Sequence, residues 1–390
     1  MCIRDRAYTD EDGRRRYNGS AATRKAVCQV VGDSGGKVST GADTFHAQFL
    51  LGFRSSIFER LADAFTGTTQ RGDDVRLTIS ERLSRYISEQ FPKGKRGAVV
   101  VLNYKTNEIL AMVSMPQFDP TNMDAALANE SAGALINRAT QGLYPPGSTF
   151  KILTAMEYMR ENPSFDKYRY ECSGSDTFGG NVIRCYNGEH HGTVDLKSSL
   201  AHSCNGSFAH IGVGLNRKSY RKLCEAFGFN SSLGVKFVSS RSRFVLDEKS
   251  DTAEAAQTAI GQGKTTITPL QNALISATIA NDGVMMTPYL VDHTESVDGH
   301  VVKKYEPQEK RTVISRKRAN QVTRMMRSVV SDGTAAALRN LSYPVAGKTG
   351  TAEIDSEGTS HAWFVGFAPA ADPKIAVSVI VEGAGTGSQY

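Results

Sequence analysis

Length, composition and charge indicate a globular protein and exclude several other classes. The chain has 390 residues, of which 40% are hydrophobic and 22% charged, and its formal net charge is +6. It is long enough for two domains with a sizeable core, and this ordinary globular composition argues against global disorder. Basic residues are spread along the chain apart from Arg14–Arg16, which predicts a solvated basic surface rather than a nucleic-acid site. No stretch approaches the roughly 18 apolar residues of a membrane span, and no signal-peptide core is present.

The two ends of the chain predict a fragment of a longer protein. The opening "MCIRDRAYTDEDGRRRY" is unlike a natural start, and the ending "VEGAGTGSQY" follows directly on a strand-like run. Residues 1–72 are rich in Gly, Ser and Thr, with one more apolar patch, "FHAQFLLGF". They predict an incomplete N-terminal module. Residues 73–390 predict a second domain that is truncated at its C-terminus.

The first part of this second domain predicts β-structure. "DDVRLTIS" predicts a short strand, and Ser80 begins a predicted helix over "SERLSRYISEQF". In "RGAVVVLNYKTNEILAMVSM", two β-rich runs flank the turn-forming segment "NYKTNE". This pattern is typical of a β-hairpin.

The middle of the chain predicts helices, and its end predicts strands again. Helices are predicted over 151–161, 217–229, 268–283 and 318–338, and residues 193–215 predict two helices around a break at Ser203–Gly206. Three β-rich runs follow at 343–354, 361–370 and 374–383. This order predicts an α/β fold of the α+β type, with one sheet assembled from both ends and an inserted helical subdomain.

Six cysteines are present, and none of them forms a CxxC pair. Cys172 and Cys185 flank the polar segment "SGSDTFGGNVIR", which fits either a disulfide-closed loop outside the cytoplasm or two reduced thiols. His190 and His191 follow, but adjacent histidines do not easily face one metal ion, so no metal site is expected. The remaining cysteines are Cys2, Cys28, Cys204 and Cys224.

The segment "YPPGSTFKILTAM" carries the first candidate catalytic pair. Ser148 and Lys151 are three residues apart, which places both on one face of a helix. A serine hydroxyl needs a neighbouring base, and a lysine can be that base when burial or positive charge lowers its pKa. Alone, the pattern fits an N-capping serine and a solvated lysine better than a catalytic pair, because it arises often by chance.

Two further motifs follow in order. Ser203 and Asn205 flank Cys204 in the predicted helix break, where a hydroxyl and an amide can face one cleft. Lys348, Thr349, Gly350 and Thr351 form "KTGT" inside a strand-like run, where glycine marks the close approach of another backbone. That approach fits a peptide added alongside the strand, and it also fits a simple bulge.

Together and in this order, the three motifs resemble the signature of serine β-lactamases and penicillin-binding proteins. With the flanks "INRATQGLYPPGSTFKILTA", "GQGKTTITPLQNALISATIANDG", "VAGKTGTAE" and "AWFVGFAPA", residues 73–390 resemble the transpeptidase domain of class B penicillin-binding proteins. "YECSG" and "IRCYNGEHHG" are similar to the penicillin-binding protein A-like members. The resemblance implies a central antiparallel sheet flanked by helices. It also implies that residues 1–72 end a non-catalytic pedestal domain.

The resemblance implies an acyl-transfer mechanism in cell-wall synthesis. Ser148 would attack the D-Ala–D-Ala bond of a peptidoglycan stem peptide, with Lys151 as the base. Ser203 would relay a proton and Asn205 would orient Lys151, while Lys348, Thr349, Gly350 and Thr351 would bind the substrate. The amides of Ser148 and Thr351 would stabilise the oxyanion. The middle residue, Cys204, is given no role.

The resemblance also implies partners, a location and alternatives. β-Lactams would acylate Ser148, no cofactor is expected, and a membrane-embedded glycosyltransferase is the expected partner of a membrane-anchored, extracytoplasmic catalytic domain. Trp363 is expected to pack, and the "GQG" of Gly261–Gly263 is expected to be a structural turn. A serine β-lactamase is the alternative, although no "ExxLN"-like deacylating segment lies between Asn205 and Lys348. The other alternative is a β-lactam sensor or an inactive scaffold protein of the same fold.

Overall fold

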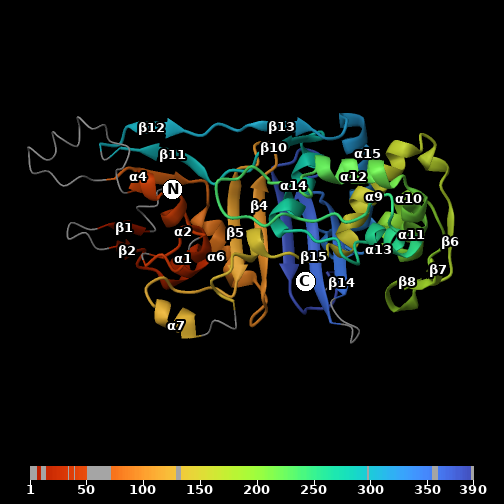
Figure 1. Cartoon of the computed structure of the whole chain (residues 1–390), viewed down its shortest axis with the longest axis horizontal. Coiled ribbons are helices and arrows are strands. Elements are labelled where there is room, and N and C mark those ends of the chain that lie inside the picture. Colours follow the sequence, from red (N-terminus) through yellow and green to blue (C-terminus); the bar gives the residue numbers. More distant parts are fainter. Residues whose placement is uncertain are drawn as a thin grey trace, which may run out of the picture.

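A five-stranded antiparallel sheet lies at the centre of the molecule (Figure 1). The computed structural model describes residues 7–9, 15–33, 35–38, 40–50, 72–128, 133–296, 298–353 and 359–387. The strand order is β14-β15-β16-β4-β5, so the last three strands pair with the predicted hairpin. This confirms the sheet assembled from both ends. The strands are β4 (Gly97–Asn103), β5 (Ile109–Met115), β14 (Ala346–Glu353), β15 (Ser360–Ala368) and β16 (Ile375–Val381).

Helices cover both faces of this sheet. Helix α14 (Pro269–Ala280) packs against β4, β15 and β16, and nearly all of its residues are buried. On the other face, Leu83 and Ile87 of α6 (Glu81–Gln90) pack into a cluster with Val99 and Val101. Because both faces are covered, β4 reads as a continuous apolar run instead of an alternating one.

The helical subdomain lies beyond the β14 edge of the sheet (Figure 1). The helices predicted here are confirmed, whereas α13 was not predicted because its sequence, "TAEAAQTA", carries small residues with little apolar periodicity. The helices are α9 (Lys151–Glu161), α10 (Leu196–Ala201), α11 (Asn205–Gly214), α12 (Arg217–Ala226), α13 (Thr252–Ala259) and α15 (Arg316–Ser331).

Several short strands pair outside the five-stranded sheet, and most of them were not predicted. Their strands are three to five residues long and carry few buried side chains, so they give weak signals. They are the pair β6 (Tyr170–Cys172) and β9 (Gly192–Val194), the pair β7 (Ser175–Phe178) and β8 (Asn181–Arg184), the pair β10 (Val284–Met286) and β13 (Glu309–Thr312), and the sheet of β3 (Asp74–Leu77), β11 (Val291–Glu295) and β12 (Val301–Lys304).

The described N-terminal residues pack directly on the sheet-bearing part. Gln29 is buried and its Nε2 donates to the carbonyls of Ser114, Pro116 and Ala134. Residues 51–71, and with them part of "FHAQFLLGF", lie outside the described residues, and the domain boundary near residue 72 stays a prediction. The elements are β1 (Ala7–Thr9), β2 (Arg15–Tyr17), α1 (Ala21–Ala26), α2 (Cys28–Val31), α3 (Ala42–Phe45) and α4 (Ala47–Leu50), with α7 (Met123–Ala128) and α8 (Arg138–Gln141) farther along.

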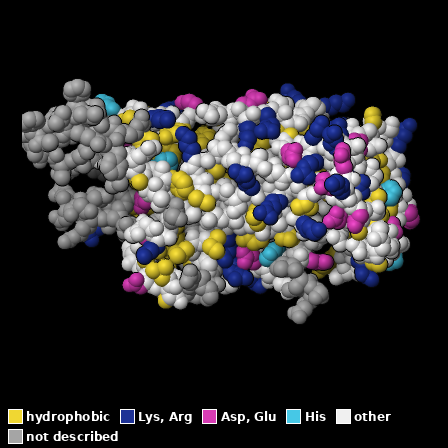
Figure 2. Space-filling view, viewed as in Figure 1, with side chains coloured by type: hydrophobic (Ala, Val, Ile, Leu, Met, Phe, Trp, Pro, Cys, Tyr) yellow, Lys and Arg dark blue, Asp and Glu magenta, His cyan; other side chains and the backbone are white. Residues whose placement is uncertain are grey.

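The surface is mixed in charge. Figure 2 shows Lys and Arg side chains dispersed over one face, with Asp and Glu among them. This distribution agrees with the expected solvated basic surface. Among the described residues, none of the helices has the length and apolarity to cross a bilayer.

Candidate active site

Ser148 lies in a short 3-10 turn, Gly147–Phe150, that runs directly into α9. The predicted helix start is therefore confirmed, but its first turn is tighter than an α-helix. Gly147 has a φ of +53°, a conformation that favours glycine. Its amide donates to the carbonyl of Gly261 at 2.9 Å, so the "GQG" turn holds the start of the Ser148 turn in place.

The Ser148 turn also lies directly against β14. A Cβ atom added to Gly147 would fall 2.5 Å from the carbonyl oxygen of Thr351. One added to Gly350 would lie 3.0 Å from Cγ2 of Thr149, so the close approach predicted at this glycine is made by the protein's own turn. The contact brings the backbones of Ser148 and Thr351 together.

Trp363 braces the residues that lead into this turn. It is buried, and its Nε1 donates to the carbonyl of Pro145 at 3.1 Å. Its ring meets that of Tyr144 edge to face, with centroids 6.0 Å apart. The expected packing role is confirmed, while the hydrogen bond to Pro145 could not be foreseen because it joins distant parts of the chain.

Lys151 is the first residue of α9, and it is fully buried. Its Nζ donates to Oδ1 of Asn205 at 2.6 Å, to the carbonyl of Ser203 at 2.7 Å and to Oγ of Ser203 at 3.1 Å. Burial lowers the pKa of Lys151 to about 8, because a charged ammonium is disfavoured away from water. A substantial fraction of this lysine is therefore neutral near physiological pH.

The second motif lies between α10 and α11. The break covers His202–Cys204, slightly earlier than predicted, because Asn205 already begins α11. Ser203 has a φ of +57°, which is uncommon outside glycine and marks a constrained turn. Nδ2 of Asn205 donates to the carbonyl of Arg184 at 2.7 Å, so both ends of this amide are held.

Lys348, which lies on β14, also contacts Ser203. It is fully buried, and its Nζ donates to Oγ of Ser203 at 3.0 Å and to the carbonyl of Thr349 at 2.9 Å. Burial, with the positive charge of Lys151 second, holds the pKa of Lys348 well below its ordinary value. Two amine groups thus converge on one hydroxyl.

The two threonines of the third motif have different surroundings. Thr349 is buried, and its hydroxyl is hydrogen-bonded to that of Thr334, whereas Thr351 is partly exposed. This difference favours a structural role for Thr349 over the predicted contact with substrate. Ser148 is also partly exposed, so another molecule can reach its hydroxyl.

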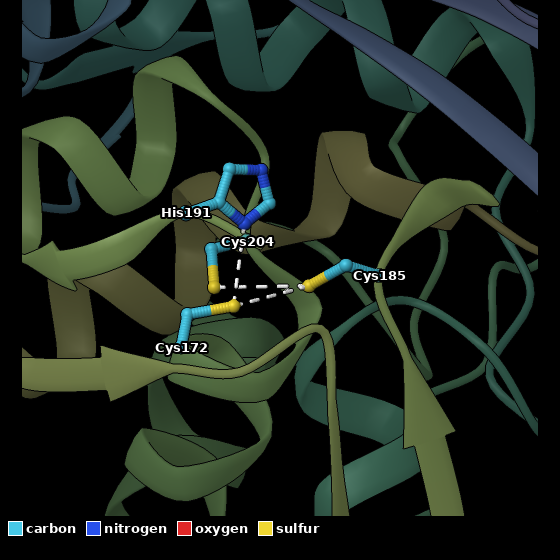
Figure 3. A group of neighbouring side chains, drawn as sticks. All are labelled: Cys172, Cys185, His191 and Cys204. Atoms are coloured by element: carbon cyan, nitrogen blue, oxygen red, sulfur yellow. Dashed lines mark hydrogen bonds between the residues drawn. The ribbon is translucent and has the colours of Figure 1, made fainter. Parts of the chain in front are cut away.

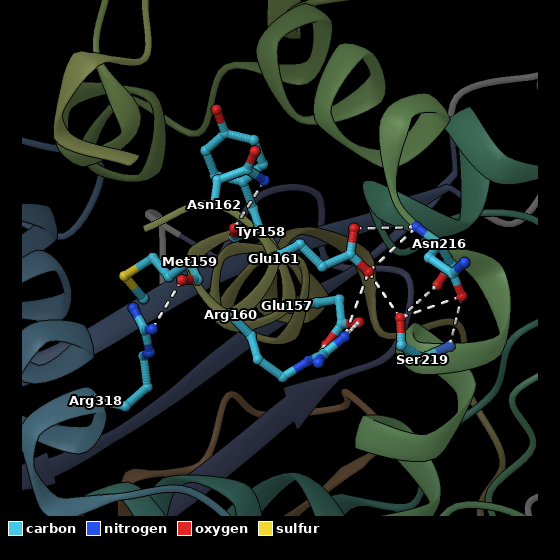
Figure 4. A network of polar contacts seen from close by, with 9 residues as sticks. All are labelled: Glu157, Tyr158, Met159, Arg160, Glu161, Asn162, Asn216, Ser219 and Arg318. Carbon is cyan, nitrogen blue, oxygen red and sulfur yellow. Dashed lines mark hydrogen bonds and ion pairs between the residues drawn. The ribbon is translucent and has the colours of Figure 1, made fainter. Parts of the chain in front are cut away.

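The far end of α9 is anchored to its neighbouring helices (Figure 4). Glu157 is fully buried and pairs with Arg160 at 2.7 Å. Glu161 accepts hydrogen bonds from the amide of Asn216 and from the hydroxyl of Ser219, and Arg318 of α15 donates to the carbonyl of Met159. These contacts fix the helix that carries Lys151.

A cluster of cysteines lies beside the second motif, in the region where the sequence predicted no metal site. The two adjacent histidines face different ways: His190 is exposed. The ring of His191 points towards Cys172, Cys185 and Cys204 (Figure 3). The thiols of Cys172 and Cys185 are 3.7 Å apart and free. Sequence alone did not reveal the cluster because Cys204 joins it from the break before α11, whereas the other three residues lie in a strand and in loops.

Comparisons with known proteins identify the family to which this site belongs. The profile of the penicillin-binding protein transpeptidase domain matches residues 97–390. The chain belongs to this family. Among its relatives, a peptidoglycan D,D-transpeptidase PbpA from Mycolicibacterium smegmatis is 33% identical over 410 residues, which cover 96% of this chain and 81% of the relative. The penicillin-binding fold is therefore established for this chain.

Solved structures of the family superpose closely. Penicillin-binding protein A from Mycobacterium tuberculosis, determined as a penicillin G acyl-enzyme complex, matches with a TM-score of 0.86 and 30% identity, covering 97% of this chain and 91% of that one. The D,D-transpeptidase domain of a peptidoglycan glycosyltransferase from Eggerthella lenta matches with a TM-score of 0.86 and 28% identity, covering 97% and 90%. The fold class predicted from the motifs is thereby confirmed.

Proposed function

We propose that this penicillin-binding protein is a peptidoglycan D,D-transpeptidase that works through an acyl-enzyme on Ser148. The observation that carries the proposal is the buried Lys151, hydrogen-bonded to both Ser203 and Asn205 one turn behind the partly exposed Ser148. An amine of lowered pKa one helical turn from Ser148 is an arrangement that can activate the hydroxyl of that serine as a nucleophile. The family membership supports the same chemistry.

In the first half-reaction, Ser148 Oγ attacks the carbonyl carbon of the D-Ala–D-Ala peptide bond. Its proton passes to neutral Lys151, and the amides of Ser148 and Thr351 stabilise the oxyanion; losing one such donor costs about 3 kcal/mol. Collapse of the tetrahedral intermediate breaks the C–N bond. The leaving amine of the terminal D-Ala takes its proton through Ser203, whose hydroxyl is bonded to both amines.

In the second half-reaction, the amine of a second stem peptide attacks the ester on Ser148 and forms the cross-link. Lys348 and Thr351 bind the terminal carboxylate of the donor peptide, with Gly350 keeping the strand close to the Ser148 turn. Because β14 is the edge strand of the sheet, its free edge can pair with the donor backbone. Thr349 supports the strand through Thr334.

A β-lactam enters by the same route and leaves a stable ester on Ser148, because its leaving group stays tethered. The catalytic domain acts outside the cytoplasm, at the membrane, on membrane-bound precursors. A membrane-embedded glycosyltransferase supplies the glycan strands that it cross-links. The name of the similar Eggerthella lenta protein, which joins transpeptidase and glycosyltransferase, supports this partnership.

The test is turnover of a stem peptide ending in D-Ala–D-Ala in the presence of an amine acceptor. Mass spectrometry should detect released D-Ala and the cross-linked product with the natural chain. Ser148→Ala should abolish both products, whereas Ser164→Ala, at an exposed serine outside the site, should leave them unchanged. Product formation by Ser148→Ala would overturn the proposal.

A further inference from the structure

Three thiols and one imidazole converge beside the second motif (Figure 3). The Sγ atoms of Cys172 and Cys185 are 3.7 Å apart, those of Cys185 and Cys204 are 3.9 Å apart, and Nδ1 of His191 lies 3.4 Å from Sγ of Cys172. One ligand atom from each of the four lies within 4.8 Å of all the others. Three of these residues are buried, and the side chain of His191 is only 6% exposed.

These spacings match the edges of a small tetrahedron. Zinc takes thiolate ligands at about 2.3 Å and imidazole nitrogen at about 2.0–2.1 Å, so tetrahedral angles place two sulfurs about 3.8 Å apart and a sulfur and a nitrogen about 3.6 Å apart. The observed 3.7, 3.9 and 3.4 Å lie close to these values. The four groups therefore surround a space of the right size for this ion.

The second ring nitrogen of His191 gives an independent indication of a metal site. Nε2 is buried and makes no hydrogen bond to any described residue, and it lies 3.6 Å from Oε2 of Glu189. A histidine that ligates zinc through one nitrogen usually donates its other N–H to a carboxylate or carbonyl, which fixes the ring. Glu189 lies where such a carboxylate is needed.

We propose that Cys172, Cys185, His191 and Cys204 form a closed tetrahedral site for Zn²⁺. Three thiolates and one imidazole are a soft ligand set that selects zinc over Mg²⁺ or Ca²⁺, which prefer oxygen. Each thiol releases its proton when it binds the ion. With four protein ligands the site has no open position, so it is of the structural type.

The site's position next to the second motif gives it a role in the proposed reaction. Cys204 lies between Ser203 and Asn205, and Cys185 follows Arg184, whose carbonyl accepts the amide hydrogen of Asn205. The ion would thus hold both the turn that carries Asn205 and the strand that orients it. Asn205 in turn holds Lys151 at 2.6 Å, so the zinc site positions the base; this part rests on the proposed transpeptidase function.

Metal analysis of the whole purified chain tests the site itself. After incubation with Zn²⁺ under reducing conditions and dialysis, the chain should retain a single equivalent of zinc, and Co²⁺ should give the intense visible bands of a tetrahedral thiolate site. Cys172→Ser and His191→Ala should lose the ion, with unfolding followed by circular dichroism. Cys224→Ser, at a buried cysteine of α12 outside the cluster, should retain it.

Three results would overturn the site. They are the absence of bound zinc in the reduced natural chain, unchanged zinc binding in Cys172→Ser and His191→Ala, and a Cys172–Cys185 or Cys185–Cys204 disulfide found by non-reducing peptide mapping of the zinc-treated protein. Because the Co²⁺ spectrum is measured on the natural chain, poor folding of a variant does not remove the test.

Acylation kinetics then separate the site from the proposed function. Removing zinc with a chelator should slow labelling by fluorescent penicillin by about 10- to 100-fold, the usual effect of losing support around a metal site. Zinc should restore it, and His191→Ala should show the slow rate at any zinc concentration. Ser148→Ala should bind zinc normally and never label. If the chain binds zinc but does not label, the transpeptidase proposal fails while the zinc site stands.

Discussion

Two buried lysines that share one serine hydroxyl dominate the chemistry of the site. Lys151 and Lys348 both donate to Oγ of Ser203, and neither is exposed to water. Two ammonium groups so close together would repel each other without solvent to screen them, so the pair favours loss of a proton. The arrangement explains how a lysine can serve as a base near neutral pH.

The rate of acylation should therefore depend on pH with a known sign. In the proposed mechanism only neutral Lys151 can accept the proton of Ser148, and burial lowers the pKa of Lys151 to about 8. Below that pH the neutral fraction falls about tenfold per pH unit, so the second-order rate of penicillin labelling should rise with pH and level off above about 8. Stopped-flow measurement of penicillin labelling from below to above pH 8 gives this rate profile. A flat profile would contradict a lysine base.

The Ser148 turn is held between two neighbouring elements, and a glycine makes that possible. Gly147 lies between the turn at Gly261 and strand β14, with its amide bonded to the carbonyl of Gly261. A side chain on Gly147 would meet Thr351 of β14, one on Gly261 would meet the backbone of Gly147, and the positive φ of Gly147 adds a further restriction. The position of Ser148 is thus set by close backbone contacts on both sides.

Gly147→Ala should damage both stability and acylation. The new Cβ would lie 2.5 Å from the carbonyl oxygen of Thr351, and a left-handed alanine adds about 1–2 kcal/mol of its own. We expect a lower melting temperature and a fall in penicillin labelling of at least tenfold. Gly214→Ala, at the end of α11 with open space around it, is the matched control and should be neutral or slightly stabilising. Equal behaviour of the two variants would contradict this description.

The prediction from sequence succeeded where signals were local. The central hairpin and the three C-terminal strands consist of long apolar runs with turn residues between them, and α9 and α14 carry clear starts and ends. The three motifs were found through their order and flanks. The structure then joined Lys151, Ser203, Asn205 and Lys348 by hydrogen bonds.

The contacts that could not be predicted all depend on tertiary proximity. The approach of Trp363 to Pro145 joins residues far apart in the chain. The cluster around Cys204 brings together a helix start and loops whose paths the sequence does not specify. Likewise, the burial of Thr349 against Thr334 follows from how α15 and its following loop pack on β14, which no local pattern encodes.

Across the whole molecule, one largely buried carboxylate ties the two halves of the sheet to the site. Glu382, directly after β16, pairs with Arg138 of α8 and with Arg96 before β4, both at 2.9 Å. It also accepts a hydrogen bond from the hydroxyl of Tyr144, which leads into the Ser148 turn. Segments from the beginning, middle and end of the domain therefore meet at one group.

Removing one partner of this group should destabilise the entire fold. The side chains of Arg138 and Glu382 are only 7% and 11% exposed, and breaking such a buried pair typically costs about 3–5 kcal/mol. Arg138→Met should therefore lower the unfolding midpoint markedly in urea. Arg85→Met removes an exposed pair with Glu89 and should change the free energy of unfolding by less than about 1 kcal/mol. Comparable small shifts in both variants would refute a structural role for Glu382.

Intact and peptide-level mass spectrometry after exposure to penicillin G tests the central claim, a covalent acyl-enzyme on Ser148, most directly. The natural chain should gain the mass of one penicillin, located on the peptide that contains Ser148, and the adduct should persist for many minutes. Ser148→Ala should gain nothing, while Ser164→Ala should be labelled normally. An adduct on another residue, or labelling of Ser148→Ala, would contradict the claim, and rapid release of hydrolysed penicillin would identify a β-lactamase instead.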